Sequence, residues 1–192
     1  YLGLSFLIGI GISNIVNWFI FPELSDKPYI FKIVNAGYTF YFGLIGFLLS
    51  ISIFLKFLNY NINAYMNELV PSITLFHGIG RIGCLLGGCC YGDICNINIY
   101  IYEFDRFPTR ELSIIYLITL TIVFQKYIKQ RRLIIYLILY PLFRFFIEFM
   151  RGDSRGQLFT KIFSPSQEIS LIIIFIVIMG TGLYYIKRNL LT

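Results

Sequence analysis

Charged residues are scarce in this sequence. Only 14% of the 192 residues are charged, whereas 57% are hydrophobic and 19% are aromatic. A soluble globular domain carries about a quarter charged residues, so this composition excludes that class and is typical of a polytopic membrane protein. The sequence also has no basic run interleaved with aromatic residues outside its apolar segments. Anionic lipid headgroups and positive-inside topology therefore explain the net charge of +6 better than nucleic acid does.

A recognisable zinc pattern is also missing. The cysteines follow C-x4-C-C-x4-C spacing, at Cys84, Cys89, Cys90 and Cys95, which fits no familiar zinc site. We therefore expect no metal and no cofactor, and interpret Cys84 and Cys89 as small residues packed between helices. A disulfide between Cys90 and Cys95 in an oxidising compartment is left open.

Two other features are missing. The sequence has no internal repeat, which disfavours a transporter built from inverted repeats. It begins at Tyr1 without a methionine and is apolar from there, so an upstream span or signal segment is left open.

Long apolar runs make up most of the sequence. Crossing a bilayer core of about 30 Å takes roughly 20 apolar residues in a helix. On that basis the sequence predicts an all-α bundle of about six transmembrane helices, forming one domain over residues 1–192. The predicted spans are about 1–21, 38–58, 69–90, 109–125, 132–149 and 167–186. The third is rich in glycine and contains Arg81, and it is predicted to have irregular backbone within 77–92. A broken or re-entrant helix is left open there.

Basic residues predict the orientation of these spans. The block "KYIKQRR" (126–132) has no compensating acid, which places it in the cytoplasm. Alternation then puts the C-terminus in the cytoplasm and the loops 22–37, 91–108 and 150–166 outside. The outer loop 150–166 nevertheless keeps Arg151, Arg155 and Lys161, against the positive-inside rule. An anionic headgroup site near the outer leaflet would need such charges.

Charges within the predicted spans form two sets. His77 and Arg81 are four residues apart and share a helix face, as do Arg144, Glu148 and Arg151. A charge at the bilayer centre costs about 2.5–3.5 kcal/mol on insertion scales, so both sets should face an interior cavity. Converging arginines suit a phosphate, because a guanidinium binds phosphate oxygens bidentately.

Alternatives for these charged residues stay open. Arg144 and Glu148 can instead form a structural ion pair, with Arg151 snorkelling to the outer interface. His77 is either a general base or a histidine packed between helices.

Together these residues resemble the prolipoprotein diacylglyceryl transferase family. "GRIGCLLGGCCYG" (80–92) resembles its signature G-R-x-G-N-F-x-N-x-E-x-x-G, with Arg81, Gly83 and Gly92 on matching positions. "RFFIEFMRGDSRG" (144–156) is similar to its R-F-x-x-E-F-x-R segment, and "SPSQEIS" (164–170) to the segment that opens its last span. "RFPTREL" (106–112) is a looser likeness to its R-H-P-T-Q-L-Y-E segment.

The chain departs from the family pattern in its polar groups. "TFYFGLIG" (39–46) resembles the family's S-F-H-G-G-L-I-G segment, but Tyr41 stands where the catalytic histidine is usual. Cys84, Gly87 and Cys89 replace the Asn, Asn and Glu of the signature. The chain therefore looks like a divergent branch.

The resemblance implies a reaction and its substrates. A diacylglyceryl group would pass from phosphatidylglycerol to the lipobox cysteine in the signal peptide of a lipoprotein precursor, at a bacterial-type cell membrane. It implies that Arg81 and Arg144 hold the phosphate, that Gly83, Gly92, Glu148 and Arg151 complete the lipid site, and that Tyr41 or His77 takes the thiol proton. The alternatives are a transporter or lipid-binding protein that uses the same arginines without chemistry, and a catalytically silent relative.

Overall fold

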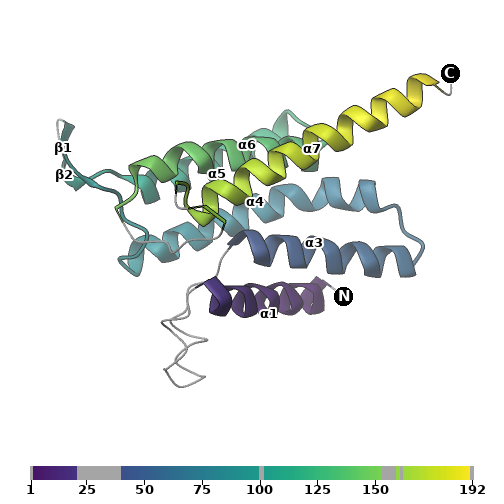
Figure 1. The fold of residues 1–192 in the computed structure, drawn as a ribbon, viewed down its shortest axis with the longest axis horizontal. Helices are drawn as coiled ribbons and strands as arrows, with labels where there is room; N and C mark the ends of the chain where they lie inside the picture. Colours follow the sequence, from purple (N-terminus) through teal and green to yellow (C-terminus); the bar gives the residue numbers. More distant parts are fainter. Residues whose placement is uncertain (1, 21–39, 100–101, 153–158, 161, 191–192) are drawn as a thin grey trace. The chain divides into compact units, whose positions relative to one another are not determined.

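The structure, a computed structural model, is a set of helices with one small hairpin (Figure 1). It describes residues 2–20, 40–99, 102–152, 159–160 and 162–190. The elements are α1 (Leu2–Ile20), α3 (Phe40–Phe57), α4 (Ile62–Leu86), β1 (Ile94–Ile99), β2 (Tyr102–Arg106), α5 (Thr109–Lys126), α6 (Arg132–Ile147), the 3-10 turn η2 (Glu148–Met150) and α7 (Pro165–Leu190). The predicted all-α membrane bundle is confirmed, with the hairpin as an addition.

Four of the described helices are long and apolar enough to cross a membrane: α3, α4, α6 and α7. The other two predicted spans are also helical. The apolar stretch of α1, Leu2–Ile15, is shorter. Helix α5 carries Arg110, Glu111 and Lys126 near its ends, which lowers its hydropathy. Whether α1 and α5 cross the membrane stays a prediction.

The chain divides into two compact units, which are described separately. The first comprises Tyr1–Tyr65 with Gly156–Ile162 and contains α1 and α3. Small residues bring these two helices close together, because a Cβ on Gly9 would lie 2.7 Å from the Gly43 carbonyl oxygen. Tyr41, at the start of α3, belongs to this unit and is buried. That 1–192 forms one domain stays a prediction.

The second unit, Met66–Arg155 with Phe163–Thr192, holds α4 from Met66 onward and the remaining elements. Hydroxyl groups connect its helices. Thr121 on α5 donates to the Thr74 hydroxyl on α4 at 2.9 Å, and Tyr116 on α5 donates to the Leu139 carbonyl on α6 at 2.8 Å. Both Thr74 and Thr121 are buried. Hydrogen-bonded hydroxyls of this kind join helices where water is excluded.

Helices α4 and α6 run in the same direction. Arg132 at the start of α6 pairs with Glu68 on the first turns of α4 at 3.1 Å. Toward the other ends of both helices, the rings of Tyr140 and His77 lie 4.6 Å apart. The loops that follow α4 and α6 therefore lie at one end of the unit, as six-span alternation predicts. Which side of the membrane they face stays a prediction.

The end of α4 differs from the prediction for 69–90. The helix continues through Arg81 to Leu86, so it is not broken at the arginine. The backbone becomes irregular only beyond Leu86, where Gly88 and Cys90 have φ of +66° and +63°. This confirms irregular backbone within 77–92 but confines it to the last residues. The following antiparallel hairpin, β1 with β2, was not predicted.

Candidate functional site

Two segments carry the site's arginines, residues 80–92 with Arg81 and residues 144–156 with Arg144 and Arg151, and we call them the two arginine motifs. Backbone hydrogen bonds join them where each follows its helix. Gly92 and Arg151 form an isolated antiparallel bridge. On either side of it, the Asp93 amide donates to the Met150 carbonyl at 2.9 Å, and the Gly152 amide donates to the Tyr91 carbonyl at 3.3 Å. Only glycine fits at 92, because a Cβ there would collide with the carbonyl oxygen of Phe107. The segment after α4 is thus fixed to the segment after α6.

The second motif forms a buried charge network. The Arg144 Nη2 lies 2.6 Å from Glu148 Oε2, and the Arg151 Nε lies 3.8 Å from the same oxygen. The three side chains are only 5%, 3% and 3% exposed, for Arg144, Glu148 and Arg151 respectively. The alternative of an Arg144–Glu148 ion pair is therefore observed. Snorkelling of Arg151 is not, because its guanidinium is held inside.

Residues from the start of α7 complete this network. The Arg144 Nη2 donates to the Ser166 hydroxyl at 3.2 Å, and the Ser164 hydroxyl donates to Glu148 Oε1 at 2.9 Å. Gln167 caps the same turn, since its Oε1 accepts from the Ser164 amide at 3.0 Å. The segment 164–170, noted in the sequence for its likeness to a family segment, thus contacts the arginine motif.

Tyr140 connects the two arginine motifs. It was not predicted from the sequence as a site residue. The Arg81 Nη2 donates to the Tyr140 hydroxyl at 3.5 Å, and that hydroxyl lies 3.3 Å from His77 Nε2. Tyr140 also lies one helical turn before Arg144, which places both on one face of α6. That spacing was the available signal. The His77 ring is buried, and Arg81 follows it by one turn on the same face of α4.

Two predicted site residues are not assigned to this arrangement. Gly83 is exposed on α4, and a Cβ there would meet no described atom within 4 Å. Tyr41 belongs to the first compact unit. The predicted roles of both residues stay predictions. At position 92, by contrast, the close backbone contacts already explain why the residue is glycine.

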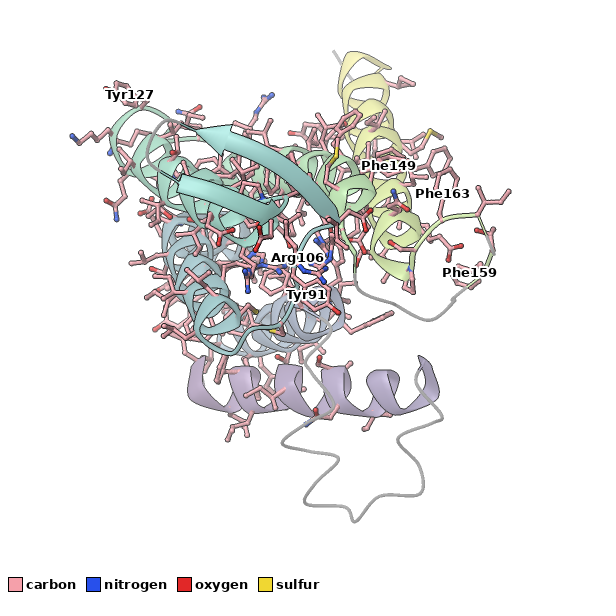
Figure 2. All side chains as sticks on the ribbon, turned by 90° about the vertical axis from the view of Figure 1, so that its left-hand side faces the viewer. Tyr91, Arg106, Tyr127, Phe149, Phe159 and Phe163 are labelled. Atoms are coloured by element: carbon pink, nitrogen blue, oxygen red, sulfur yellow. The ribbon has the colours of Figure 1, made fainter. Side chains whose placement is uncertain are left out.

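The hairpin adds Arg106 to the site. In the sequence, Arg106 was noted only as the first residue of a segment that loosely resembles a family segment. Figure 2 shows Arg106 beside Tyr91, with the guanidinium carbon 4.4 Å from the ring centroid. The Arg106 Nη1 also donates to the Gly92 carbonyl at 3.3 Å. Arg106 therefore holds the segment that joins the two motifs.

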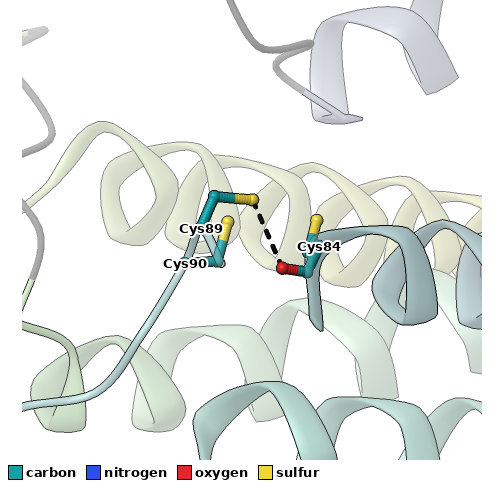
Figure 3. A group of neighbouring side chains, drawn as sticks. All are labelled: Cys84, Cys89 and Cys90. Carbon is teal, nitrogen blue, oxygen red and sulfur yellow. Dashed lines mark hydrogen bonds between the residues drawn. The ribbon is translucent and has the colours of Figure 1, made fainter. Parts of the chain in front are cut away.

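Three thiols gather at the end of α4 (Figure 3). The Sγ atoms of Cys84, Cys89 and Cys90 all lie within 4.8 Å of one another. All four cysteines are free, so the disulfide between Cys90 and Cys95 is not formed. Cys89 is exposed and lies after the helix, so its interpretation as a helix-packing residue is wrong.

Comparison with known proteins identifies close relatives. Residues 3–183 match the family model described as prolipoprotein diacylglyceryl transferase. The chain is 32% identical over 180 residues to the phosphatidylglycerol–prolipoprotein diacylglyceryl transferase of Clostridium tetani, covering 86% of this chain and 70% of that protein. It is 34% identical over 179 residues to phosphatidylglycerol–prolipoprotein diacylglyceryl transferase 2 of Clostridium perfringens, covering 86% and 68%.

Proposed function

This chain belongs to the prolipoprotein diacylglyceryl transferase family, and we propose that it transfers a diacylglyceryl group from phosphatidylglycerol to the lipobox cysteine of a lipoprotein precursor. The thiol sulfur forms a thioether with the glyceryl carbon, and glycerol phosphate leaves. The observation that carries the proposal is the meeting of the two arginine motifs, through the Gly92–Arg151 bridge and through Tyr140. Both relatives described above carry the name of this activity.

Arg81 and Arg144 hold the phosphate of the donor lipid. A guanidinium has five N–H donors, so it can bind a protein partner and a phosphate together. Arg144 is oriented by Glu148 and Ser166, and Arg81 by Tyr140. As the carbon–oxygen bond breaks, negative charge grows on the leaving phosphate, and preorganised guanidinium groups stabilise it.

Glu148 and Arg151 act beside this pair. The Glu148 carboxylate contacts both Arg144 and Arg151, which lets one acid offset part of two buried positive charges. Arg151 meets the headgroup where α6 ends, and Gly83 and Gly92 line the approach of the lipid.

His77 or Tyr41 takes the proton of the acceptor thiol. The observed contacts favour His77 as the base, because its Nε2 contacts Tyr140, which also contacts Arg81. Measuring thiol transfer and phosphatidylglycerol binding for His77→Ala and Tyr41→Phe separates the two candidates. The base is the residue whose change abolishes transfer while donor binding is unchanged.

The enzyme is placed in a bacterial-type cell membrane with its site near the outer leaflet and its C-terminus in the cytoplasm. The basic block Lys126–Arg132 supports this orientation. The acceptor cysteine lies in a signal peptide that enters the site from the membrane.

A mass-shift assay tests the proposal. Purified protein is incubated with phosphatidylglycerol and a peptide that carries a lipobox cysteine, and the peptide is weighed by mass spectrometry. We expect the mass to rise by one diacylglyceryl group, with no change for the matched peptide that has serine in place of cysteine. Lipid binding without a mass shift would instead support a non-catalytic lipid-binding protein or transporter, or a silent relative.

A further inference from the structure

The thiol cluster at the end of α4 is not used by the proposed reaction. Its members are Cys84 in the last turn of α4 and Cys89 and Cys90 in the turn that follows. Sequence spacing disfavoured a metal, but the chain reverses after Leu86 and brings the three Sγ atoms within 4.8 Å of one another. Figure 3 shows the three side chains gathered at this turn.

The separation of the sulfur atoms suits a shared metal ion. Thiolates bind zinc at about 2.3 Å, so two sulfurs on a tetrahedral ion lie about 3.8 Å apart. The sulfurs here need to approach by at most about 1 Å, a shift that side-chain rotation in a turn supplies. Soft thiolate ligands select Zn²⁺ or Cu⁺ over hard cations.

The backbone at the turn is held in an unusual conformation. Cys90 has φ of +63°, which is uncommon for a residue with a side chain. Its carbonyl accepts a hydrogen bond from the Thr109 hydroxyl at 3.0 Å, which fixes the turn against the start of α5. The Cys89 amide donates to the Cys84 carbonyl at 3.2 Å. These contacts hold two of the thiols beside the third before any ion binds.

The surrounding charge also suits such a site. Arg81 lies three residues before Cys84 on α4, so the two side chains are neighbours on one helix face. A positive charge there offsets part of the negative charge that three thiolates bring to one ion. The cluster also places sulfur at 84 and 89, where the family signature quoted above has an asparagine and a glutamate.

We propose that Cys84, Cys89 and Cys90 bind one thiophilic metal ion, Zn²⁺ or Cu⁺, and that an open coordination position takes the thiol of the acceptor. Three protein ligands leave the fourth tetrahedral position of zinc to an exogenous ligand, and Cys89 is exposed at the site. The second half of this proposal rests on the proposed function. A thiol that binds the ion gives its proton to the base of the proposed function, His77 or Tyr41. Its sulfur then forms the C–S bond while the C–O bond breaks, and the electron pair leaves on the phosphate oxygen.

Metal binding is tested on the full chain in detergent, without any substrate. Reduced protein is titrated with Cd²⁺, and the thiolate-to-cadmium absorbance is followed. We expect one equivalent to bind. Loss of an outer partner of a metal ligand already costs about 10–100-fold in affinity, so Cys84→Ser, Cys89→Ser and Cys90→Ser should each weaken binding about 100-fold or more. Cys95→Ser is the matched control and should bind as the wild type does.

A second measurement on the wild-type chain does not depend on variants folding. Bound Cd²⁺ should protect Cys84, Cys89 and Cys90 from maleimide while Cys95 stays reactive. Equal protection of all four thiols, no protection of the three, or equal binding by all four serine variants would overturn the site.

The acceptor position has its own test. With Co²⁺ in the site, the lipobox peptide should change the visible absorption bands, and the serine peptide should not. Unchanged bands with both peptides would overturn the role of the acceptor thiol. Metal binding without any diacylglyceryl transfer would refute the proposed function and leave the metal site standing, whereas transfer without metal binding would do the reverse.

Discussion

Arg144 and Glu148 form a buried ion pair with 2.6 Å between Nη2 and Oε2, across one helical turn at the end of α6. The same carboxylate oxygen lies 3.8 Å from the Arg151 Nε. The two buried guanidinium groups therefore share the Glu148 carboxylate. Burying a charge is costly unless it is paired, so removing the Glu148 carboxylate should destabilise this arrangement.

Glu148→Gln should destabilise the protein by about 3 kcal/mol, because breaking a buried pair leaves a charge uncompensated. Thermal unfolding in detergent measures the loss. Glu68→Gln is the matched control, because the Glu68 side chain is 76% exposed in its pair with Arg132. That change should cost less than about 1 kcal/mol. Equal losses for the two variants would contradict the central role of Glu148.

Tyr140→Phe should lower kcat/KM for transfer about tenfold, because hydrogen bonds to charged groups contribute about 1.5–3 kcal/mol. The variant keeps the ring that packs on His77 and removes only the hydroxyl that Arg81 contacts. Tyr136→Phe is the control, since Tyr136 is also buried on α6 and its ring stacks on that of Tyr140. It should change kcat/KM less than about twofold. A similar loss in both variants would assign the effect to packing.

Arg81→Lys and Arg144→Lys should each lower transfer by about 2–4 kcal/mol, a hundredfold or more, by analogy with losing one preorganised oxyanion donor. Lysine keeps the charge but lacks the planar fork. Contacts that strengthen as the phosphate leaves act on kcat more than on donor binding. Steady-state kinetics distinguish the two effects.

The control for these arginine variants is Arg110→Lys, on α5, where the guanidinium pairs only loosely with Glu111 at 3.8 Å. Its transfer rate should stay near that of the wild type. Should both Arg81→Lys and Arg144→Lys retain full activity, the shared-phosphate mechanism is wrong and the arginines are structural.

Gly92→Ala should destabilise the protein by several kcal/mol, because the added methyl meets backbone atoms that cannot move aside cheaply. Besides Phe107, the new Cβ would lie 2.9 Å from the Met150 carbonyl oxygen. Gly80→Ala is the control, since a Cβ there meets no described atom within 4 Å. Unfolding temperature should fall for the first variant and hold or rise for the second. A tolerated alanine at 92 would refute the tight contact.

Cysteine labelling tests the orientation. In a chain that keeps only Cys95, a membrane-impermeant maleimide should react from outside the cell. In a cysteine-free chain carrying Lys129→Cys, it should react only after the cytoplasmic side is opened. The reverse pattern would invert the predicted topology.

Most of the correct predictions came from local sequence patterns, that is, apolar runs and the spacing of charged residues. The run 132–149 predicted α6 and η2 almost to the residue, because an apolar stretch of membrane length has few alternatives to a helix. The i, i+4 spacing of Arg144 and Glu148 likewise predicted their contact.

Contacts between distant segments could not be predicted in this way. The bridge from Gly92 to Arg151 and the hydrogen bond from Arg81 to Tyr140 join residues 59 apart in sequence. The thiol cluster could not be predicted either, because its geometry depends on a turn with positive φ at Cys90 that the cysteine spacing does not reveal.

The bridge between Gly92 and Arg151 constrains its two positions unequally. Backbone pairing makes no demand on the side chain at 151, so selection can choose that residue for its charge alone. Position 92 has no such freedom, because any side chain strikes the Phe107 carbonyl. In a saturation mutagenesis library, position 92 should accept glycine only. Variants at 151 should instead be tolerated by the backbone and graded by activity, with some loss of stability because each removes a buried partner of Glu148.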